Sequence, residues 1–487
     1  MVDGKALRAV SHNYPNIMLA CWEHVSNIVF KILKASTAEV PTTTWKGNVG
    51  SVGFIGEKVI TAAIKVLDEC LRAISGFKGT EDLLDDKLLD TPFTSDCIRT
   101  KKVSSAPLYE QGSPEDIREE AKASQSGSEQ WSETIEKHIP LILRHTSAMV
   151  RTATITCFAG ITSSVFISLV KETQEFIISS VISAALHDEV PSVRSAACRA
   201  IGVISCFPHI SHSAEILDKF IHAVEINTCD PLVSVRITAS WALANICDSL
   251  RRCIDDFPFK SSADSNVNSQ MMQSLTECAL HLTKDGDKIK SNAVRALGNL
   301  ARFVKYTSSA CVHASSDKTG GHGCVANSSH PACLGDSRCL ERMVQAFLSC
   351  VTTGNVKVQW NVCHALSNLF LNETLNLQDM DWAPSVFSVL LLLLRDSSNF
   401  KIRIQAAAAL AVPSSFYDYG NSFSDVIQGL EHILENLGSD QISAPSSFKY
   451  RVALEKQVKH LNNLHHSSTL DRSDMRFCSW SSLSDTN

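Results

Sequence analysis

The chain has 487 residues, and its 45 Lys and Arg against 51 Asp and Glu give a formal net charge of −6. With 44% hydrophobic and 20% charged residues, its composition is that of an ordinary folding chain, which excludes collagen-like and wholly disordered proteins. The acidic balance and the lack of Lys/Arg-rich blocks predict no nucleic-acid partner. No stretch is typical of a signal peptide or a membrane span, so we expect no membrane partner and a cytoplasmic or nuclear location.

Residues 1–90 form the first predicted region. Two apolar helical stretches, Asn16–Lys34 and Phe54–Ile74, predict one or two divergent helical repeats. Met1 leads almost directly into a helix with no capping repeat before it, which is compatible with a longer protein whose N-terminal repeats are missing here. Residues 91–130 shift to Ser, Lys and Glu with turn signals, and this predicts a flexible linker.

Residues 131–465 contain a recurring register, which marks a repeat array. The register has six apolar anchor positions: Val150, Val193, Val235, Ile289, Val358 and Ile402. Their spacings are 43, 42, 54, 69 and 44 residues, and three of the five fall in the period of about 40–47 residues that HEAT and armadillo repeats share. The two longer spacings predict insertions near residues 255–268 and 306–338.

Small residues dominate the positions four and seven after each anchor, and large apolar residues follow at the eighth. These offsets lie on one stripe of a helix, and the small side chains on it allow a neighbouring helix to approach closely. Another amphipathic stretch precedes each anchor helix, as in Glu172–Leu186 and Leu340–Val351. We therefore predict an all-α, armadillo/HEAT-type α-solenoid of stacked helical repeats with two loop insertions.

Cysteine is frequent in the chain, which has 17 of them. Most are single residues in apolar helical stretches, where a free thiol is expected to behave as a small core residue. The second insertion concentrates possible soft metal ligands: Cys311, His313, His322, Cys324, His330, Cys333 and Cys339. Their spacing does not match the paired ligands of structural zinc sites, so we expect a disordered loop, no metal and no cofactor. Residues 466–487 are expected to form a disordered tail.

Two kinds of motif carry a family resemblance. Asp188-x4-Val193-Arg194 and Asp230-x4-Val235-Arg236 resemble the HEAT pattern, in which Asp and Arg of successive repeats form a ladder. Trp241-Ala-Leu-Ala-Asn245 resembles the third helix of an armadillo repeat. The run from SVRSAACRAIGV to VQWNVCHALSNLF is most similar to the family of HEAT repeat-containing protein six and its plant relatives, a resemblance that implies an armadillo-type fold and little about function.

Six residues on the flank of the buried stripe are the candidate partner-binding residues: Trp241, Asn245, Arg295, Asn299, His364 and Asn368. Asparagines so placed hold an extended peptide in armadillo importin adaptors, where a Trp lies four residues earlier. Alternatively, the asparagines hydrogen-bond a neighbouring repeat. The same flank carries Arg199 and Arg302, so its basic character also predicts a groove for an acidic partner.

No catalytic motif appears in the sequence, so we expect a protein that is not an enzyme. The predicted function is a non-enzymatic scaffold or adaptor that binds another protein through the concave face of the solenoid, between Val193 and Leu410. Two alternatives stay open. One is a karyopherin-like carrier of an extended peptide, and the other is a regulatory platform subunit of an enzyme complex. The sequence does not identify the partner.

Overall fold

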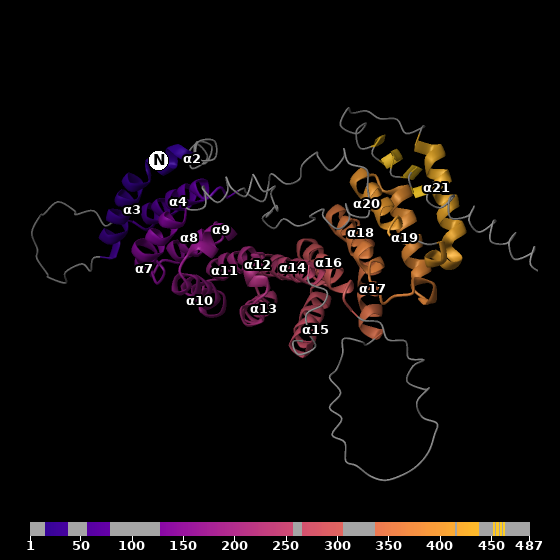
Figure 1. The fold of residues 1–487 in the computed structure, drawn as a ribbon, viewed down its shortest axis with the longest axis horizontal. Coiled ribbons are helices and arrows are strands. Elements are labelled where there is room, and N and C mark those ends of the chain that lie inside the picture. Colours follow the sequence, from indigo (N-terminus) through magenta and orange to yellow (C-terminus); the bar gives the residue numbers. More distant parts are fainter. Residues whose placement is uncertain are drawn as a thin grey trace, which may run out of the picture. The chain divides into compact units, whose positions relative to one another are not determined.

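The computed structural model describes residues 15–37, 56–77, 127–256, 265–304, 337–413 and 416–437, with scattered positions between 451 and 462. Throughout these ranges the secondary structure is helical, and they contain no β-strand. The helices form two compact units, which meet in the chain after Asp256 (Figure 1). The predicted all-α fold is confirmed.

The described part of the first unit begins with three N-terminal helices and continues as helix pairs. Its elements are α2 (Pro15–Ala20), α3 (Trp22–Thr37), α4 (Glu57–Ile74), the π-helical turn η2 (Thr134–His138), α7 (Ile139–Ile142), α8 (Ala148–Phe158), α9 (Ser163–Ser168), α10 (Lys171–His187), α11 (Pro191–Ile204), α12 (Pro208–Ser211), α13 (Ala214–Thr228) and α14 (Val233–Asp256). The main pairs here are α10 with α11 and α13 with α14.

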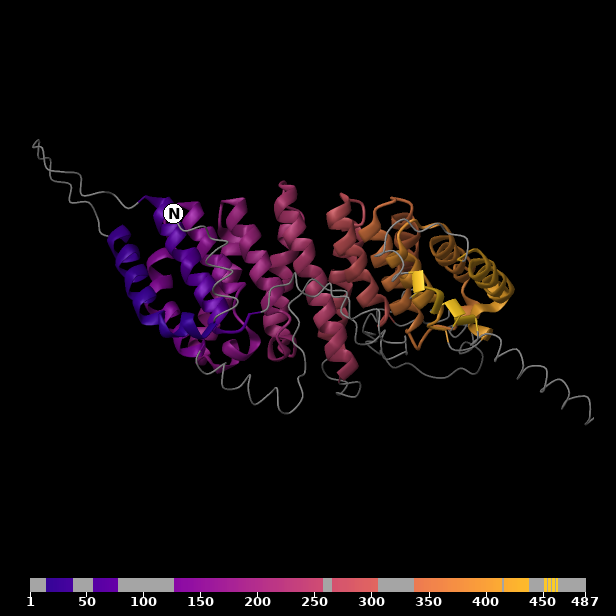
Figure 2. The same cartoon turned by 90° about the horizontal axis from the view of Figure 1, so that it is seen from above.

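The second unit repeats this arrangement. Its elements are α15 (Ser265–Leu282), α16 (Asp287–Ala301), α17 (Ser337–Val351), α18 (Val356–Phe370), the 3-10 turn η4 (Leu377–Asp379), α19 (Ala383–Asp396), α20 (Phe400–Leu410), the 3-10 segment η5 (Phe416–Ser422) and α21 (Phe423–Leu437). Here α15, α17 and α19 are the first helices, and α16, α18 and α20 are the second helices that carry the anchors. Figure 2 shows the helix pairs of each unit side by side.

The predicted repeat register is confirmed by burial. All six anchors are at most 1% exposed, and so are the residues four, seven and eight positions after each anchor. The described helix bounds extend the predicted first helices by a few residues, as in α10 and α17. One apolar stripe per second helix thus forms the core of each unit, the architecture of an α-solenoid.

The second helices approach one another very closely at two glycines. A Cβ atom added to Gly298 in α16 would lie 2.6 Å from the Cα atom of Ala365 in α18. In the first unit, a Cβ atom on Gly202 in α11 would lie 2.9 Å from the Cα atom of Ala242 in α14. Both glycines lie nine residues after an anchor and both alanines lie seven after the next one. The small-residue columns therefore set the distance between successive repeats.

Polar side chains near the helix ends also join successive repeats. In the first unit, Ser249 donates to the carbonyl oxygen of Ser205 over 2.8 Å. In the second, the amide of Asn372 donates to the carbonyl oxygens of Ala301 and Val304, each over 2.8 Å. Ser249 and Asn372 both lie fourteen residues after their anchors. These bonds satisfy carbonyl groups that a helix end leaves without an intrahelical partner.

The N-terminal helices belong to the first unit, because α4 packs on α8 and α3 packs on η2. Trp22 Nε1 donates to Glu133 Oε2 over 2.7 Å, and Ser26 Oγ donates to Glu133 Oε1 over 2.9 Å. The pKa of Glu133 lies below its ordinary value, because these bonds and Lys137 outweigh partial burial, which would raise it. Pro140 lacks an N–H, which accounts for the π-helical turn just before it.

Several predicted regions lie outside the described residues. Residues 127–142 are described and helical, and the predicted start of the array at residue 131 stays a prediction. Most of the linker, both insertions and the tail lie outside the described ranges. Among the described cysteines, Cys157, Cys198 and Cys363 are buried as predicted, and burial raises the pKa of the Cys198 and Cys363 thiols to about 12.

The close helix approach gives a testable prediction. Alanine normally stabilises a helix relative to glycine by about 1 kcal/mol. At Gly298 the added methyl group would instead meet the backbone of Ala365, so Gly298→Ala should lower the free energy of unfolding by about 1–3 kcal/mol. Urea unfolding followed by circular dichroism would measure this change. Gly286→Ala is the control, because nothing lies within 4 Å of its added Cβ atom. A Gly298→Ala variant as stable as the unmodified chain would contradict the close approach.

Candidate interaction surface

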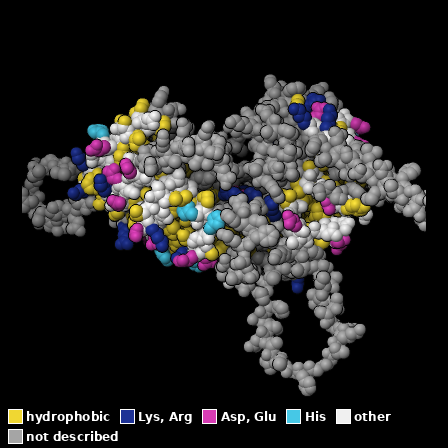
Figure 3. Space-filling model, in the orientation of Figure 1, with side chains coloured by type: hydrophobic (Ala, Val, Ile, Leu, Met, Phe, Trp, Pro, Cys, Tyr) yellow, Lys and Arg dark blue, Asp and Glu magenta, His cyan; other side chains and the backbone are white. Residues whose placement is uncertain are grey.

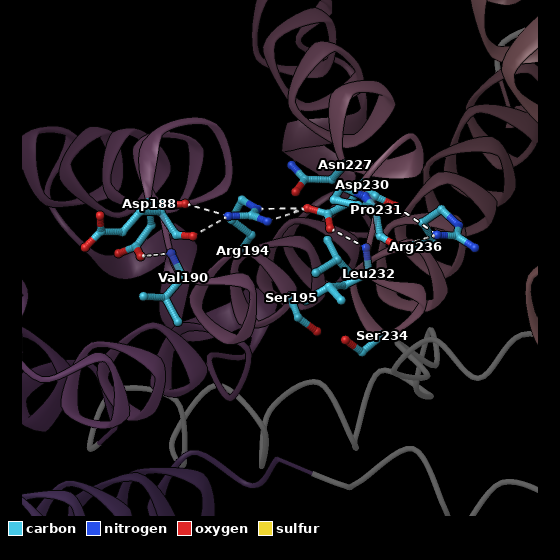
Figure 4. Close-up of polar contacts among 12 residues, drawn as sticks. Asp188, Val190, Arg194, Ser195, Asn227, Asp230, Pro231, Leu232, Ser234 and Arg236 are labelled. Atoms are coloured by element: carbon cyan, nitrogen blue, oxygen red, sulfur yellow. Dashed lines mark hydrogen bonds and ion pairs between the residues drawn. The ribbon is translucent and has the colours of Figure 1, made fainter.

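A ladder of ion pairs lines the turns between first and second helices of the first unit. Arg151 donates from Nε and Nη2 to the two carboxylate oxygens of Asp188 over 2.8 and 3.0 Å. Arg194 donates from the same two atoms to Asp230 Oδ2 over 3.0 and 2.6 Å. Each arginine comes from one repeat and each aspartate from the next, and Figure 4 shows the second of these rungs. The predicted Asp–Arg ladder is therefore confirmed in this unit.

Each ladder residue also organises its own turn. Arg194 Nη1 donates to the carbonyl oxygens of Asp188 and Glu189 over 3.0 and 2.9 Å, and Asp188 Oδ1 accepts from the Val190 N–H over 2.9 Å. Arg236 makes the corresponding bond to the carbonyl oxygen of Asp230 over 2.9 Å. A single guanidinium group thus fixes one turn and holds the next repeat.

Arg151 forms a rung that the two sequence motifs do not contain. Its position directly after the anchor Val150 is the same as that of Arg194 and Arg236, and this register was the available signal. In the second unit Lys290 and Gln359 stand directly after their anchors in place of Arg, and other contacts are found there. Gln359 donates to the carbonyl oxygen of Val351 over 3.2 Å, and Asn355 donates to Asp287 over 3.1 Å.

Asp188 is the most informative titratable group of the ladder. Partial burial by itself would raise its pKa, but the hydrogen bonds from Arg151 and the Val190 N–H, with the charges of Arg151 and Arg194, outweigh burial. The pKa of Asp188 therefore lies below its ordinary value. A lowered pKa in the folded state means that ionised Asp188 stabilises the fold above a pH of about 4, and that this contribution is lost as the pH falls further.

The accessible face of the second helices in the first unit combines hydroxyl groups with one cation–aromatic pair. The exposed guanidinium group of Arg199 lies 4.9 Å from the ring centroid of Trp241, which is 8% exposed. Beside it, Ser195 and Thr238 hydroxyls are hydrogen-bonded over 2.9 Å between α11 and α14. The predicted residue Trp241 is thus mostly covered, and Arg199 is the accessible member of the pair.

The three predicted asparagines differ from one another in the structure. Asn245 is completely buried, and its amide donates to the carbonyl oxygen of Gly202 over 3.0 Å. Asn299 is 4% exposed, whereas Asn368 is half-buried. For Asn245 the structure shows the second of the two predicted alternatives, a hydrogen bond to the neighbouring repeat. Burial of Asn245 and Asn299 corrects the expectation that all three amides lie on an accessible row.

In the second unit, α18 presents an accessible stripe beside its buried one. Its members, spaced three or four residues apart, are Lys357, Trp360, His364 and Asn368. The Trp360 and His364 rings meet edge to face with centroids 4.4 Å apart, and His364 Nδ1 lies 3.3 Å from Gln405 Nε2 of α20. We call these four residues the α18 stripe. It contains two predicted site residues, His364 and Asn368, and two further residues, Lys357 and Trp360, that were not predicted.

The α18 stripe is electropositive. The pKa of Lys357 lies below its ordinary value because its ammonium group is partly desolvated and the positive charge of Arg295 acts on it. Arg295, another predicted site residue, is only 8% exposed on the neighbouring helix α16. An anionic group placed near Lys357 would relieve this repulsion. The predicted basic character of the flank is represented here by Lys357.

The described residues lack two features that would mark a metal site or a membrane span. They contain no group of three or more His, Cys, Asp and Glu placed to hold a metal ion, and the Cys/His-rich insertion lies outside them except for Cys339 at its edge. None of the described helices is long and apolar enough to cross a membrane. On the face seen in Figure 3, hydrophobic, basic and acidic side chains are intermixed over the first unit.

Comparison with known sequences identifies one repeat type. Residues 177–205, which cover most of α10 and all of α11, match the HEAT repeat. A curated relative, an uncharacterized protein of Dictyostelium discoideum, is 27% identical over 398 residues, covering 64% of this chain and 26% of the relative. The chain therefore spans about a quarter of the length of that relative. The more specific resemblance to HEAT repeat-containing protein six stays a prediction.

Solved structures similar to this chain include engineered repeat proteins. One engineered protein has a TM-score of 0.40 and 16% identity, covering 95% of this chain and 96% of its own. A designed armadillo repeat protein has a TM-score of 0.36 and 17% identity, covering 56% of this chain and 98% of its own. The helix pairs of the described residues are those of an all-α solenoid, and residues 177–205 match one HEAT repeat.

The ladder gives a prediction about pH. Asp188→Asn removes the charge that Arg151 and Arg194 hold, so at pH 7 it should lower the free energy of unfolding by about 1–3 kcal/mol. Below a pH of about 4 the difference should shrink, because Asp188 of the unfolded chain becomes protonated there, and folding then requires the loss of that proton or leaves Asp188 uncharged. Thermal unfolding at pH 7 and pH 3 would measure both effects. Asp396→Asn is the control, since its pair with Arg395 is half exposed and should contribute little. A deficit that is equal at both pH values would contradict this role.

Proposed function

We propose that this chain is a non-enzymatic scaffold or adaptor that binds another protein through the accessible faces of its second helices. The observation that carries the proposal is the α18 stripe. The apolar stripe of α18 is buried between the stacked repeats. The four residues of the α18 stripe are exposed or half-buried, so a partner can reach them. Aromatic and cationic side chains of this kind are enriched where proteins bind one another.

The chemistry of the α18 stripe favours an acidic segment of the partner. Lys357 and Arg295 supply positive charge, and Trp360 supplies a flat apolar surface beside it. Gln405 bonds to His364, so the imidazole that contacts the Trp360 ring is held in place before a partner arrives. A pre-positioned surface loses less side-chain entropy on binding than a mobile one.

A regulatory platform is the second candidate function, and one observation favours it. Three large apolar side chains at the turn between α13 and α14 are exposed: Ile226 by 50%, Leu232 by 48% and Val233 by 52%. Apolar side chains gathered on a surface mark a site of protein contact more often than scattered ones do. A platform that docks through its turns requires such a surface. The carrier alternative has less support, because the amides of Asn245 and Asn299 are buried.

Affinity purification with quantitative mass spectrometry would test both functions. The unmodified chain would be compared with a Lys357→Glu/Trp360→Ala variant and with a Leu232→Ser/Val233→Ser variant, each shown to be folded by circular dichroism. We expect the amount of specific partners captured by the first variant to fall at least tenfold, and the amount captured by the second variant to stay unchanged. Loss in the second variant alone would favour the platform. Partners unaffected by either change would contradict both proposals.

A further inference from the structure

A groove of about 490 Å³ lies between the end of α7 and helix α10 in the first unit. One wall is formed by Leu143 and Arg144, which follow α7, and the opposite wall is one side of α10 from Phe176 to His187. The floor contains Ile155 of α8, which is 1% exposed, and Val193 of α11. This groove is separate from the α18 stripe, which belongs to the other unit.

The groove stays open because small side chains line it. Ser180, Ser183 and Ala184 stand where α10 faces the preceding repeat, and they are too short to fill the space. The opposite side of α10 is packed in the usual way, since the amide of Asn227 in α13 donates to the carbonyl oxygen of Ala185 over 2.9 Å. The opening is therefore a local property of the α7–α10 junction.

One end of the groove is positively charged. Arg151 donates to the carbonyl oxygen of His145 over 2.9 Å and also to Asp188, so the neighbouring residues Arg144 and His187 lie at this same end. Asp188, the one carboxylate among the lining residues, is already paired with Arg151. Arg144 is exposed and has no hydrogen bond or ion pair to any residue that the structure describes.

Further hydrogen-bond donors lie along the same groove. The hydroxyls of Ser180 and Ser183 make no hydrogen bond within the described part of the chain, and neither does the imidazole of His187. These groups and Arg144 are all suited to donate to a carboxylate. Phe176, eleven positions before His187 in α10, and Leu143 give the groove an apolar surface. The groove thus combines donors for an anion with an adjoining apolar surface.

We propose that the groove between α7 and α10 binds a peptide segment of a partner protein that places a carboxylate side chain near Arg144 and His187. An apolar side chain of the same segment packs on Phe176 and Ile155. The side of α10 from Phe176 to His187 spans twelve residues, about 16 Å along the helix axis. An extended segment of about five residues covers this length, so the occupant is a polypeptide segment rather than a single small ion.

The test uses a phage-displayed library of random 12-residue peptides, selected on the full chain. Selected peptides are then synthesised, and their affinities are measured by fluorescence anisotropy. Arg144→Glu reverses the charge of an exposed side chain, and Ala184→Trp fills the groove. Lys219→Glu, on the exposed surface of α13, is the matched charge-reversal control. Circular dichroism confirms that each variant is folded.

We expect a set of selected peptides with Asp or Glu next to Leu, Ile or Phe. Their affinity should fall at least tenfold with Arg144→Glu and with Ala184→Trp, and it should be unchanged with Lys219→Glu. Replacing the acidic residue of the peptide by Gln or Asn should cause a similar loss. The proposal is overturned if no peptide depends on both groove variants, or if the peptides that do so lack an acidic residue. Peptides lost only with Trp360→Ala would instead report on the α18 stripe.

Discussion

The close contact between successive second helices is the constraint on which the rest of each unit depends. Gly298 lies against Ala365, and Gly202 lies against Ala242 and the Trp241 ring, so closely that neither glycine position has room for a Cβ atom. At this separation, hydrogen bonds from one repeat reach the helix-end carbonyls of the previous one, as Ser249 and Asn372 show. Tight packing and inter-repeat hydrogen bonding therefore have the same cause, which is the small size of the side chains at fixed positions of the repeat.

This packing also decides which surfaces are left for binding. The apolar stripe of each second helix is buried between stacked repeats. A partner can therefore contact only the residues on the flank of that stripe, the turns, or a place where the repeats do not pack completely. The α18 stripe is a flank of this kind, Leu232 and Val233 lie at a turn, and the groove beside α10 is a gap in the stacking. These three surfaces are the places where the proposals above put a partner.

Sequence periodicity predicted the fold well because the residues at the repeated positions are the ones that are buried in the core. Every anchor, and every residue four, seven or eight after it, is in the core. The accessible surface was harder to predict because a residue on the flank of a stripe faces either solvent or the next helix, depending on how closely that helix packs. Asn245 and Asn368 occupy the same register position, yet only Asn368 is accessible.

Other features needed the three-dimensional structure for a different reason. The groove depends on the small side chains Ser180, Ser183 and Ala184, which face the residues that follow α7. The periodicity of a sequence does not show where short side chains leave space between two helices. The serine-rich side of α10 was the one available signal. The ladder rung from Arg151 needed only its register, whereas the pairing of Trp360 with His364 and Gln405 joins two repeats through side chains of unrelated type.

Amide hydrogen exchange, measured by mass spectrometry on the full chain, tests the central claim most directly. If close packing of the second helices stabilises each unit, α11 and α14 should exchange more slowly than α10 and α13, and α16 and α18 more slowly than α17. The slowest segment should be Ser291–Ala301 of α16, in which every residue is buried. Exchange in α14 or α16 as fast as in the first helices would contradict the claim that the contacts at Gly202 and Gly298 hold the repeats together.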